Sequence, residues 1–269
     1  MMNKMNLEQF TLLQTLLEQC ENSGDEFDNI IWKPVNVDSA TIQEFDQHVK
    51  VVEESKDWPT NLNWKKGRVL EDLAVFLFER FSGVVEVKKN KRGDNETDIE
   101  TKLSDKALPT FIKECIGLKI ICECKNYKSK SIDVGMVTKL AEIIPDRGSR
   151  FGIFISINGM GGYGWRYGEG KRKKIMYSEK IPIISFTLNE LKPLREGKNL
   201  YTFIQEKYNL LVDDVDDESA ELPNESQVEY SKRLHEIIEH FYKCELIDHT
   251  QFKIIKENAI KRYGSLHND

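Results

Sequence analysis

The sequence has no long hydrophobic run. No stretch of about 18 consecutive apolar residues occurs among its 269 residues, so we expect no membrane-spanning helix. The first residues, Met1 to Met5, contain no apolar signal core and instead open an amphipathic helix, so we expect no secretory leader. With 39% hydrophobic and 31% charged residues, the chain has the composition of a globular protein with one sizeable core and smaller appendages.

Cysteine and histidine are scarce, with five of each. An odd number of cysteines favours a reducing compartment, so we expect a cytoplasmic location. Cys122 and Cys124 share one face of a predicted strand, and we interpret them as packing residues rather than a zinc site, which would need two more ligands. The histidines, which all lie outside the predicted core and offer no natural general base, are His48, His235, His240, His249 and His267.

The chain does contain a hydrophobic strand, residues 120–126, that ends in charged residues. Successive side chains on a strand point to opposite faces, so Glu123 and Lys125 share one face. A carboxylate beside an ammonium can hold a hard cation such as Mg²⁺ and offset the charge that develops on a phosphate oxygen. Such pairs flank many strands, so the meaning of this one depends on the residues upstream.

Two upstream segments supply partners for this pair. Residues 67–78 carry an apolar stripe at helical spacing, with Glu71 beside it near the helix start, where the helix dipole also favours an acidic residue. After a predicted strand at residues 84–88 and a polar turn, Asp98 opens a second strand. Glu100 lies two residues further along, on the same strand face as Asp98, and is either its rival or an additional ligand.

This order of elements resembles the PD-(D/E)xK nuclease superfamily, and most closely the Mrr-like restriction enzymes. The similarity rests on a Gly-x-x-Leu-Glu helix at residues 67–71, an Asp-led strand at residues 97–100 and a Glu-Cys-Lys-Asn strand end at residues 123–126. It covers residues 61–191, about half of the chain. Thr97 replaces the proline of the motif, at a position that varies within the superfamily. The resemblance implies an α/β fold with a restriction-endonuclease-like core, in which helices flank a mixed β-sheet.

The resemblance also implies metal-assisted phosphodiester hydrolysis, with Glu71, Asp98, Glu123 and Lys125 as the catalytic set. Asp98 and Glu123, together with the backbone carbonyl of Cys124, would hold Mg²⁺, for which Mn²⁺ can substitute. Glu71 would bind a second metal ion or hold a metal-bound water. Lys125 would position or deprotonate the attacking water, or stabilise the transition state.

Charge is distributed unevenly along the chain. The net charge is −6, yet residues 119–174 hold twelve Lys or Arg against five Asp or Glu. A basic face on an acidic protein suits a polyanionic partner such as DNA. A glycine-rich, aromatic loop at residues 159–168 precedes the densest basic cluster, and we expect it either to contact DNA or to be a flexible surface loop. The residues expected to bind DNA are Lys128, Lys130, Arg166, Lys171, Arg172 and Lys173.

We expect the nuclease core to span residues 61–212. Residues 103–117 are long for a hairpin connection and predict an insertion or short helix, with a lid or a substrate contact as its possible role. Lys139 is expected to face solvent, although it could reach the site. The later part of the core is predicted to contain a helix at residues 133–144, capped by Asp133, and strands at residues 150–156 and 181–186. The strand at residues 150–156 is expected to follow the Glu-x-Lys strand through a parallel crossover.

Helical segments are expected on both sides of this core. Residues 1–60 form a predicted N-terminal helical region, in which residues 21–38 read as a polar connection between two helices. Residues 213–225 are rich in acidic residues and read as a linker. Residues 226–269 predict a C-terminal helical hairpin whose apolar stripes need a partner, so we expect it to dock on the core or to mediate oligomerisation.

These features together predict a metal-dependent DNA endonuclease that acts in restriction or antiviral defence, as a homodimer or as part of a defence complex, with no attachment to a membrane. A repair or structure-specific nuclease with the same site is an alternative. A non-catalytic nucleic-acid-binding subunit is a second alternative, against which the intact set of acidic residues and lysine argues.

Overall fold

A computed structural model describes residues 25–90, 97–105, 108–161, 167–213 and 228–263, together with positions 7, 11, 12 and 15. The predicted helix over residues 7–20, most of the predicted acidic linker, and Arg166 with its neighbours in the glycine-rich loop lie outside these described residues. In the described part of the chain, no helix combines the length and the apolar character needed to cross a membrane.

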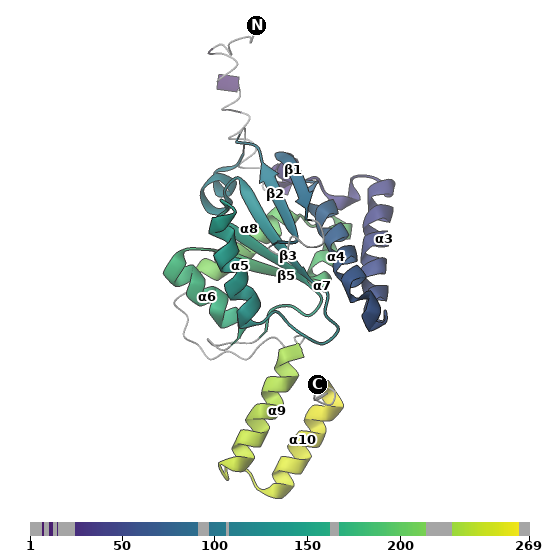
Figure 1. Ribbon diagram of the computed structural model, residues 1–269, viewed down its shortest axis with the longest axis vertical. Helices are drawn as coiled ribbons and strands as arrows, with labels where there is room; N and C mark the ends of the chain where they lie inside the picture. The colour runs from purple at the N-terminus through teal and green to yellow at the C-terminus, as the bar shows by residue number, and fades with distance from the viewer. Residues whose placement is uncertain are drawn as a thin grey trace.

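The centre of the fold is a five-stranded sheet with the strand order β1-β2-β3-β4-β5 (Figure 1). The first three strands are antiparallel neighbours, whereas β3, β4 and β5 run parallel to one another. The strands are β1 (Val84–Lys89), β2 (Ile99–Leu103), β3 (Lys119–Lys125), β4 (Phe151–Ser156) and β5 (Ile183–Thr187). All six residues of β4 are buried, as expected for a parallel strand covered on both faces. The predicted mixed sheet and its parallel crossover are confirmed.

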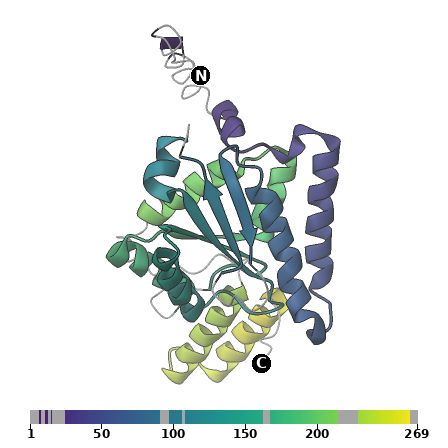
Figure 2. The same ribbon diagram turned by 45° about the horizontal axis from the view of Figure 1, so that its top comes forward.

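Helices cover the sheet on both faces (Figures 1 and 2). The N-terminal part of the described chain has α2 (Asp25–Ile31), η1 (Val35–Val37), α3 (Ser39–Ser55), η2 (Thr60–Leu62) and α4 (Asn63–Phe78). The middle has the π-helix η3 (Ile112–Ile116), α5 (Val134–Asp146) and α6 (Gly168–Glu179). The remainder has α7 (Leu188–Leu191), η4 (Lys192–Glu196), α8 (Leu200–Asp213), α9 (Val228–Lys243) and α10 (His249–Tyr263).

Two hydrophobic cores lie on opposite sides of β3. Cys122 and Cys124 belong to the larger core, with α4, α8 and the N-terminal segment. Ile121, from the alternate face of the strand, belongs to the smaller core with α5 and α6. A hydrogen bond from Cys122 and burial raise the pKa of the Cys124 thiol. A neutral thiol in an apolar core is a packing group and not a metal ligand, which agrees with the interpretation of both cysteines.

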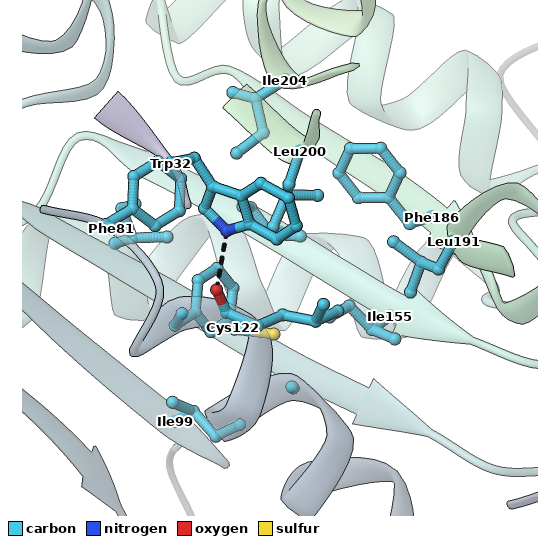
Figure 3. Close-up of a cluster of buried hydrophobic side chains, with 14 of the residues drawn as sticks. Trp32, Phe81, Ile99, Cys122, Ile155, Phe186, Leu191, Leu200 and Ile204 are labelled. Carbon is cyan, nitrogen blue, oxygen red and sulfur yellow. Dashed lines mark hydrogen bonds between the residues drawn. The ribbon is translucent and has the colours of Figure 1, made fainter. Parts of the chain in front are cut away.

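The segment predicted as a polar connection, residues 21–38, is partly helical and contributes to the core. It contains α2, and Trp32 is completely buried among residues from distant parts of the chain (Figure 3). The indole N–H of Trp32 donates a hydrogen bond of 2.9 Å to the carbonyl of Leu77. The sequence predicts a polar, Trp-containing connection, but not that its tryptophan joins the core, since that depends on contacts with distant residues.

The connection between β2 and β3 contains the expected short helix, which lies away from the predicted site. Phe111, just before η3, packs edge-on against Tyr201 and Tyr208 of α8. Since β2 and β3 are antiparallel, this connection lies at the end of β3 opposite to Lys125. A seven-residue strand spans about 20 Å. The described residues of this connection therefore lie at the far end of β3 from Lys125, and a contact between them and the substrate stays a prediction.

Candidate active site

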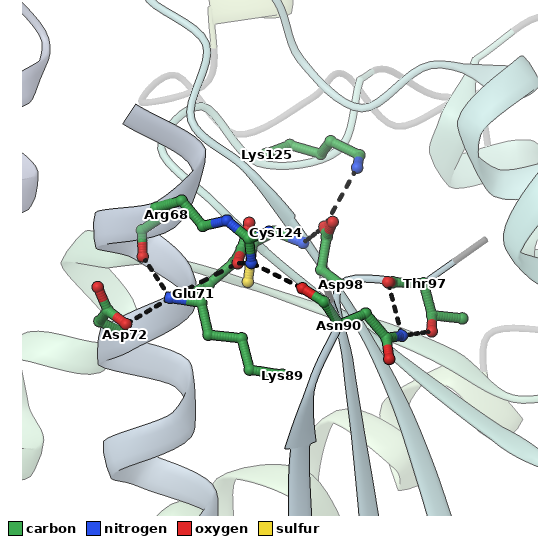
Figure 4. Close-up of polar contacts among 9 residues, drawn as sticks. All are labelled: Arg68, Glu71, Asp72, Lys89, Asn90, Thr97, Asp98, Cys124 and Lys125. Atoms are coloured by element: carbon green, nitrogen blue, oxygen red, sulfur yellow. Dashed lines mark hydrogen bonds and ion pairs between the residues drawn. The ribbon is translucent and has the colours of Figure 1, made fainter. Parts of the chain in front are cut away.

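Asp98, Glu123 and Lys125 meet where β2 begins and β3 ends. The two strands are antiparallel, which places the residue before β2 beside the last residues of β3. Asp98 Oδ2 accepts a hydrogen bond of 2.7 Å from the backbone N–H of Cys124 and lies 3.5 Å from Lys125 Nζ (Figure 4). Lys125 Nζ also lies 2.5 Å from Glu123 Oε2. Asp98 and Lys125, which are 27 positions apart in the sequence, thus form one ion-paired cluster with Glu123.

Glu71 approaches the cluster from α4 and is held by two cations. Arg68 Nη1 lies 2.6 Å from Glu71 Oε2, and Lys89 Nζ of β1 lies 3.7 Å from the same atom (Figure 4). Arg68 also donates a hydrogen bond of 2.8 Å to the carbonyl of Asn90. Burial, and then the charge of Asp98, raise the pKa of Glu71 in spite of these cations. Glu71 therefore belongs to the same electrostatic site as Asp98.

The negative charge of the site is only partly compensated. Burial and the neighbouring Asp98 raise the pKa of Glu123 to about 7. Burial opposes the charge of Lys125, but Glu123 and Asp98 outweigh it and raise the pKa of the ammonium. Lys125 is therefore protonated at neutral pH. One lysine facing the buried carboxylate of Glu123 and the half-buried carboxylate of Asp98 leaves an excess of negative charge that a cation would offset.

The oxygen ligands of the site are of the type that hard divalent cations prefer. Asp98 and Glu123 offer carboxylates, the donors that Mg²⁺ and Mn²⁺ prefer, whereas the thiol of Cys124 points into the hydrophobic core. Among the residues that the structure describes, however, no group of three or more His, Cys, Asp or Glu side chains is arranged to hold a metal ion. The physical reason is that Arg68 and Lys89 hold Glu71, while Lys125 pairs with both other carboxylates.

Glu100, which the sequence leaves as a rival or extra ligand, makes contacts elsewhere. Its carboxylate lies 3.3 Å from Arg147 Nη1 and 3.8 Å from Lys119 Nζ. Lys119 opens β3 and Arg147 follows α5, so both partners lie away from the strand end that carries Lys125. Asp98 precedes β2 and turns its side chain towards the Cys124 N–H, whereas Glu100 lies within the strand.

Sequence reasoning missed several residues that support the site. Asn126 donates hydrogen bonds of 2.9 Å to Ser55 Oγ and 2.8 Å to the Lys66 carbonyl, which ties the end of β3 to α3 and α4. Arg68 is another, and its place three residues before Glu71 was a readable signal. Lys139 is exposed, as expected. Its positive charge nevertheless opposes the rise in the pKa of Glu123, so it also acts on the site.

The residues predicted to bind DNA divide into three groups. Lys128 and Lys130 are exposed on the loop that follows Lys125, where they pair with Asp57 and Asp133. Lys171 and Lys173 lie on α6, together with Arg172, which is largely buried, pairs with Glu169 and lies 3.5 Å from the Ile183 carbonyl. Arg166 lies outside the described residues. Lys128 and Lys130 thus lie at the edge of the site, whereas Arg172 forms an ion pair with Glu169.

A comparison with known families agrees with this geometry. The restriction endonuclease family, in its Mrr catalytic form, matches residues 64–181. No curated protein and no solved structure matches the chain. The matched segment runs from the first turn of α4 to the residues before β5, so it includes Glu71, Asp98, Glu123 and Lys125. Residues 64–181 therefore match an Mrr-type restriction endonuclease domain, which supports the resemblance of this part of the chain to the PD-(D/E)xK nuclease superfamily.

Proposed function

We propose that the chain is a Mg²⁺-dependent DNA endonuclease whose catalytic residues are Glu71, Asp98, Glu123 and Lys125. The observation that carries the proposal is the meeting of Asp98, Glu123 and Lys125 at adjoining strand ends, within the segment that matches the restriction endonuclease family. Mn²⁺ is expected to replace Mg²⁺, since both are hard cations that favour oxygen donors.

Asp98, Glu123 and the Cys124 carbonyl would hold the metal ion. When bound, such an ion polarises the phosphate and lowers the pKa of a coordinated water. The Cys124 N–H keeps Asp98 oriented through its hydrogen bond. Burial of Glu123 keeps bulk water away from its carboxylate and strengthens its attraction for a cation.

Lys125 acts as a cation in this proposal. Its raised pKa disfavours proton abstraction and suits the other two roles, namely positioning the attacking water and stabilising the negative charge of the transition state. Glu71 would orient a water or a second metal ion from the side of α4. For that role Glu71 must exchange its contact with Arg68 for one with the ligand.

DNA would lie along the basic side of the domain. Lys128 and Lys130 are exposed beside Lys125, and Lys171 and Lys173 extend the positive charge onto α6. Contacts of this kind position the phosphate backbone without reading sequence. Arg166 and Arg172 were predicted in the same role, for which Arg172 would first have to leave Glu169.

The proposed biological role is cytoplasmic restriction or defence against foreign DNA, by a homodimer or within a defence complex. The domains remain those proposed from sequence, with a nuclease core at residues 61–212 between helical flanks at residues 1–60 and 226–269. Two antiparallel DNA strands require two cuts, which a dimer with one site in each protomer would supply. A repair or structure-specific nuclease would use the same site.

The test is cleavage of supercoiled plasmid DNA, with Mg²⁺ or Mn²⁺ and with EDTA. We expect metal-dependent cutting that falls at least about 100-fold in Lys125→Ala and in Asp98→Ala, because each change removes charge from the reacting centre. Lys50→Ala is the matched control, since Lys50 is an exposed lysine of α3 whose partner is Glu54, one turn away.

DNA binding without cutting under both metals would refute the nuclease and favour a non-catalytic binding subunit. Full activity in Lys125→Ala would refute the assignment of the site. Equal losses in Lys50→Ala would show that removing any lysine weakens the enzyme.

A further inference from the structure

The flank of α4 that carries Glu71 also carries an exposed tryptophan. Trp64, Arg68 and Glu71 are separated by four and three residues, so they form one stripe along the helix. This stripe faces the start of β2 and the end of β3, since Arg68 and Glu71 point towards Asp98 in Figure 4. Trp64 retains 52% of its surface exposed at the N-terminal end of the stripe. Along the helix it lies about 10 Å from Glu71, at 1.5 Å per residue.

A second exposed aromatic residue lies at the end of β3. Tyr127 follows the Glu-Cys-Lys-Asn motif and is 38% exposed. Asn158 donates a hydrogen bond of 2.9 Å to the carbonyl of Tyr127, which fixes the backbone there. Tyr127 comes two residues after Lys125, so it directly follows the proposed catalytic motif along the chain. Asn126, the residue before Tyr127, donates a hydrogen bond to the Lys66 carbonyl in the first turn of α4.

A lysine follows each of the two aromatic residues in the sequence, Lys65 after Trp64 and Lys128 after Tyr127. Lys65 Nζ lies 5.2 Å from the ring centre of Trp58, in the connection before α4, and Lys128 Nζ lies 3.7 Å from Asp57 of the same connection. The strand end, the loop after it and the start of α4 therefore form one continuous surface beside the acidic site. We call Trp58, Trp64 and Tyr127, with Lys65 and Lys128, the aromatic rim.

Isolated exposed aromatic side chains are ordinary on protein surfaces. Three features set the rim apart. Trp64 lies on the same stripe of α4 as Glu71, and Tyr127 follows Lys125 by two residues. A lysine comes directly after each of these two rings in the sequence, and the surface joins the basic loop after β3. Aromatic faces next to positive charge are what proteins use to bind single-stranded nucleic acid, with bases stacked on the rings and the backbone held by the lysines. In duplex DNA the base faces are stacked on one another and are not available to a side chain.

We infer that the aromatic rim stacks unpaired bases of a DNA strand whose phosphate lies at Asp98, Glu123 and Lys125, so that the substrate carries unpaired nucleotides next to the cut. This inference rests on the proposed nuclease function and adds the class of DNA. The separation of Trp64 and Glu71, about 10 Å, corresponds to roughly three stacked bases at 3.4 Å each. Trp64 is expected to contact a base a few nucleotides from the cleaved bond.

Binding is measured first, in EDTA, with single-stranded oligothymidylate and with a fully paired duplex of the same length. We expect Trp64→Ala to weaken binding of the single strand by about 5- to 150-fold, the range for loss of one base stack, and to leave duplex binding nearly unchanged. Trp64→Phe keeps a ring and is expected to restore most of the affinity. Tyr177→Ala is the matched control, because Tyr177 is an exposed aromatic residue of α6 with Lys180 over its ring.

Unchanged single-strand binding in Trp64→Ala, or equal losses on both DNAs, would overturn the inference. So would equal losses in Tyr177→Ala. Cleavage then separates the two claims: with Mg²⁺, a duplex containing an unpaired segment should be cut faster than the paired duplex, and Trp64→Ala should remove that preference. If the protein cuts plasmid DNA and Trp64→Ala has no effect, base stacking on the aromatic rim is wrong but the proposed nuclease function stands. If Trp64→Ala weakens binding but no DNA is cut, the proposed nuclease function is wrong but base stacking on the aromatic rim stands.

Discussion

Lys125 is the counter-ion of two carboxylates in the candidate active site. It lies 2.5 Å from Glu123 and 3.5 Å from Asp98, and only a minor part of its side chain is exposed. A lysine in this position limits the repulsion between the two acids without cancelling it, since the pKa of Glu123 stays raised. Repulsion between the two carboxylates therefore lowers the stability of the folded protein. Binding of a proton or a cation, or removal of one charge, relieves this repulsion.

The first prediction concerns Glu123→Gln. The folded protein raises the pKa of Glu123 from 4.5 to about 7, so between these values it binds a proton more tightly than the unfolded chain does. Ionised Glu123 therefore lowers stability as pH rises through this window. In EDTA at pH 8 we expect Glu123→Gln to raise the free energy of unfolding by about 1–3 kcal/mol. Near pH 4 the two proteins should be equally stable.

Urea unfolding at both pH values measures this difference. An equal gain at pH 4 and pH 8 would mean that packing of the amide, and not the charge of Glu123, causes it. A loss of stability at pH 8 would contradict the raised pKa. Glu142→Gln, at an exposed position of α5, provides the control for replacing a carboxylate outside the cluster.

At the scale of elements, the site depends on how β3 is fixed to α4. The sheet positions Asp98 against Glu123 and Lys125, but Glu71 comes from a helix and needs a separate tie. Asn126 supplies it, because its buried amide bonds both Ser55, the last residue of α3, and the Lys66 carbonyl in α4. The family motif ends in this asparagine, whose role here is to hold the end of β3 against α3 and α4.

Asn126→Ala should therefore weaken both the fold and the reaction. It removes two buried hydrogen bonds, to Ser55 Oγ and to the Lys66 carbonyl, which costs about 1–3 kcal/mol of unfolding free energy. We also expect a lower kcat with little change in KM, since Glu71 and Lys125 lose their fixed relation while the DNA contacts remain. Asn158→Ala is the matched control, because the Asn158 amide also donates two hydrogen bonds, here to the carbonyls of Tyr127 and Lys130, but in an exposed setting.

Thermal unfolding and steady-state cleavage test this prediction together. A variant as active as the wild type at a temperature where both are folded would contradict the positioning role. Asn158→Ala with the same loss of kcat would show that the effect does not come from the tie to α4.

Most elements of the core could be predicted from sequence because their apolar residues recur at regular spacing. The helix with Glu71, the cap of α5 by Asp133 and the buried β4 follow from local patterns. Trp32 could not be placed, since its contacts come from residues far along the chain. The pairing of Glu71 with Arg68 and Lys89 was also missed, because Lys89 reaches α4 only once β1 has packed beside it.

At the scale of the whole molecule, the C-terminal hairpin is the part least explained by the nuclease site. Its helices pack on each other through Tyr242 and Phe252, whose ring centres lie 4.6 Å apart. Other apolar side chains stay exposed, including Leu246 at 69% and Ile254 at 54%. A hairpin with this much apolar surface suits the proposed homodimer, in which two copies bury it together.

We predict that the protein sediments as a dimer and that Ile254→Glu combined with Ile255→Glu converts it to a monomer. Both residues are exposed in α10, so the charges would be tolerated in the monomer but not in an apolar interface. Thermal unfolding of the nuclease core should be nearly unchanged. Sedimentation velocity is the measurement, with Lys253→Glu as a control on the same helix. A monomeric wild type, or a variant that remains dimeric, would contradict this role of the hairpin.

The most direct test of the proposed site is a crystal structure with Mn²⁺, located by anomalous scattering. A manganese ion bound by the carboxylates of Asp98 and Glu123, with the Lys125 ammonium moved away from Glu123, is the result expected. Manganese bound elsewhere, or an unchanged ion pair between Lys125 and Glu123 at saturating Mn²⁺, would contradict the metal-dependent nuclease.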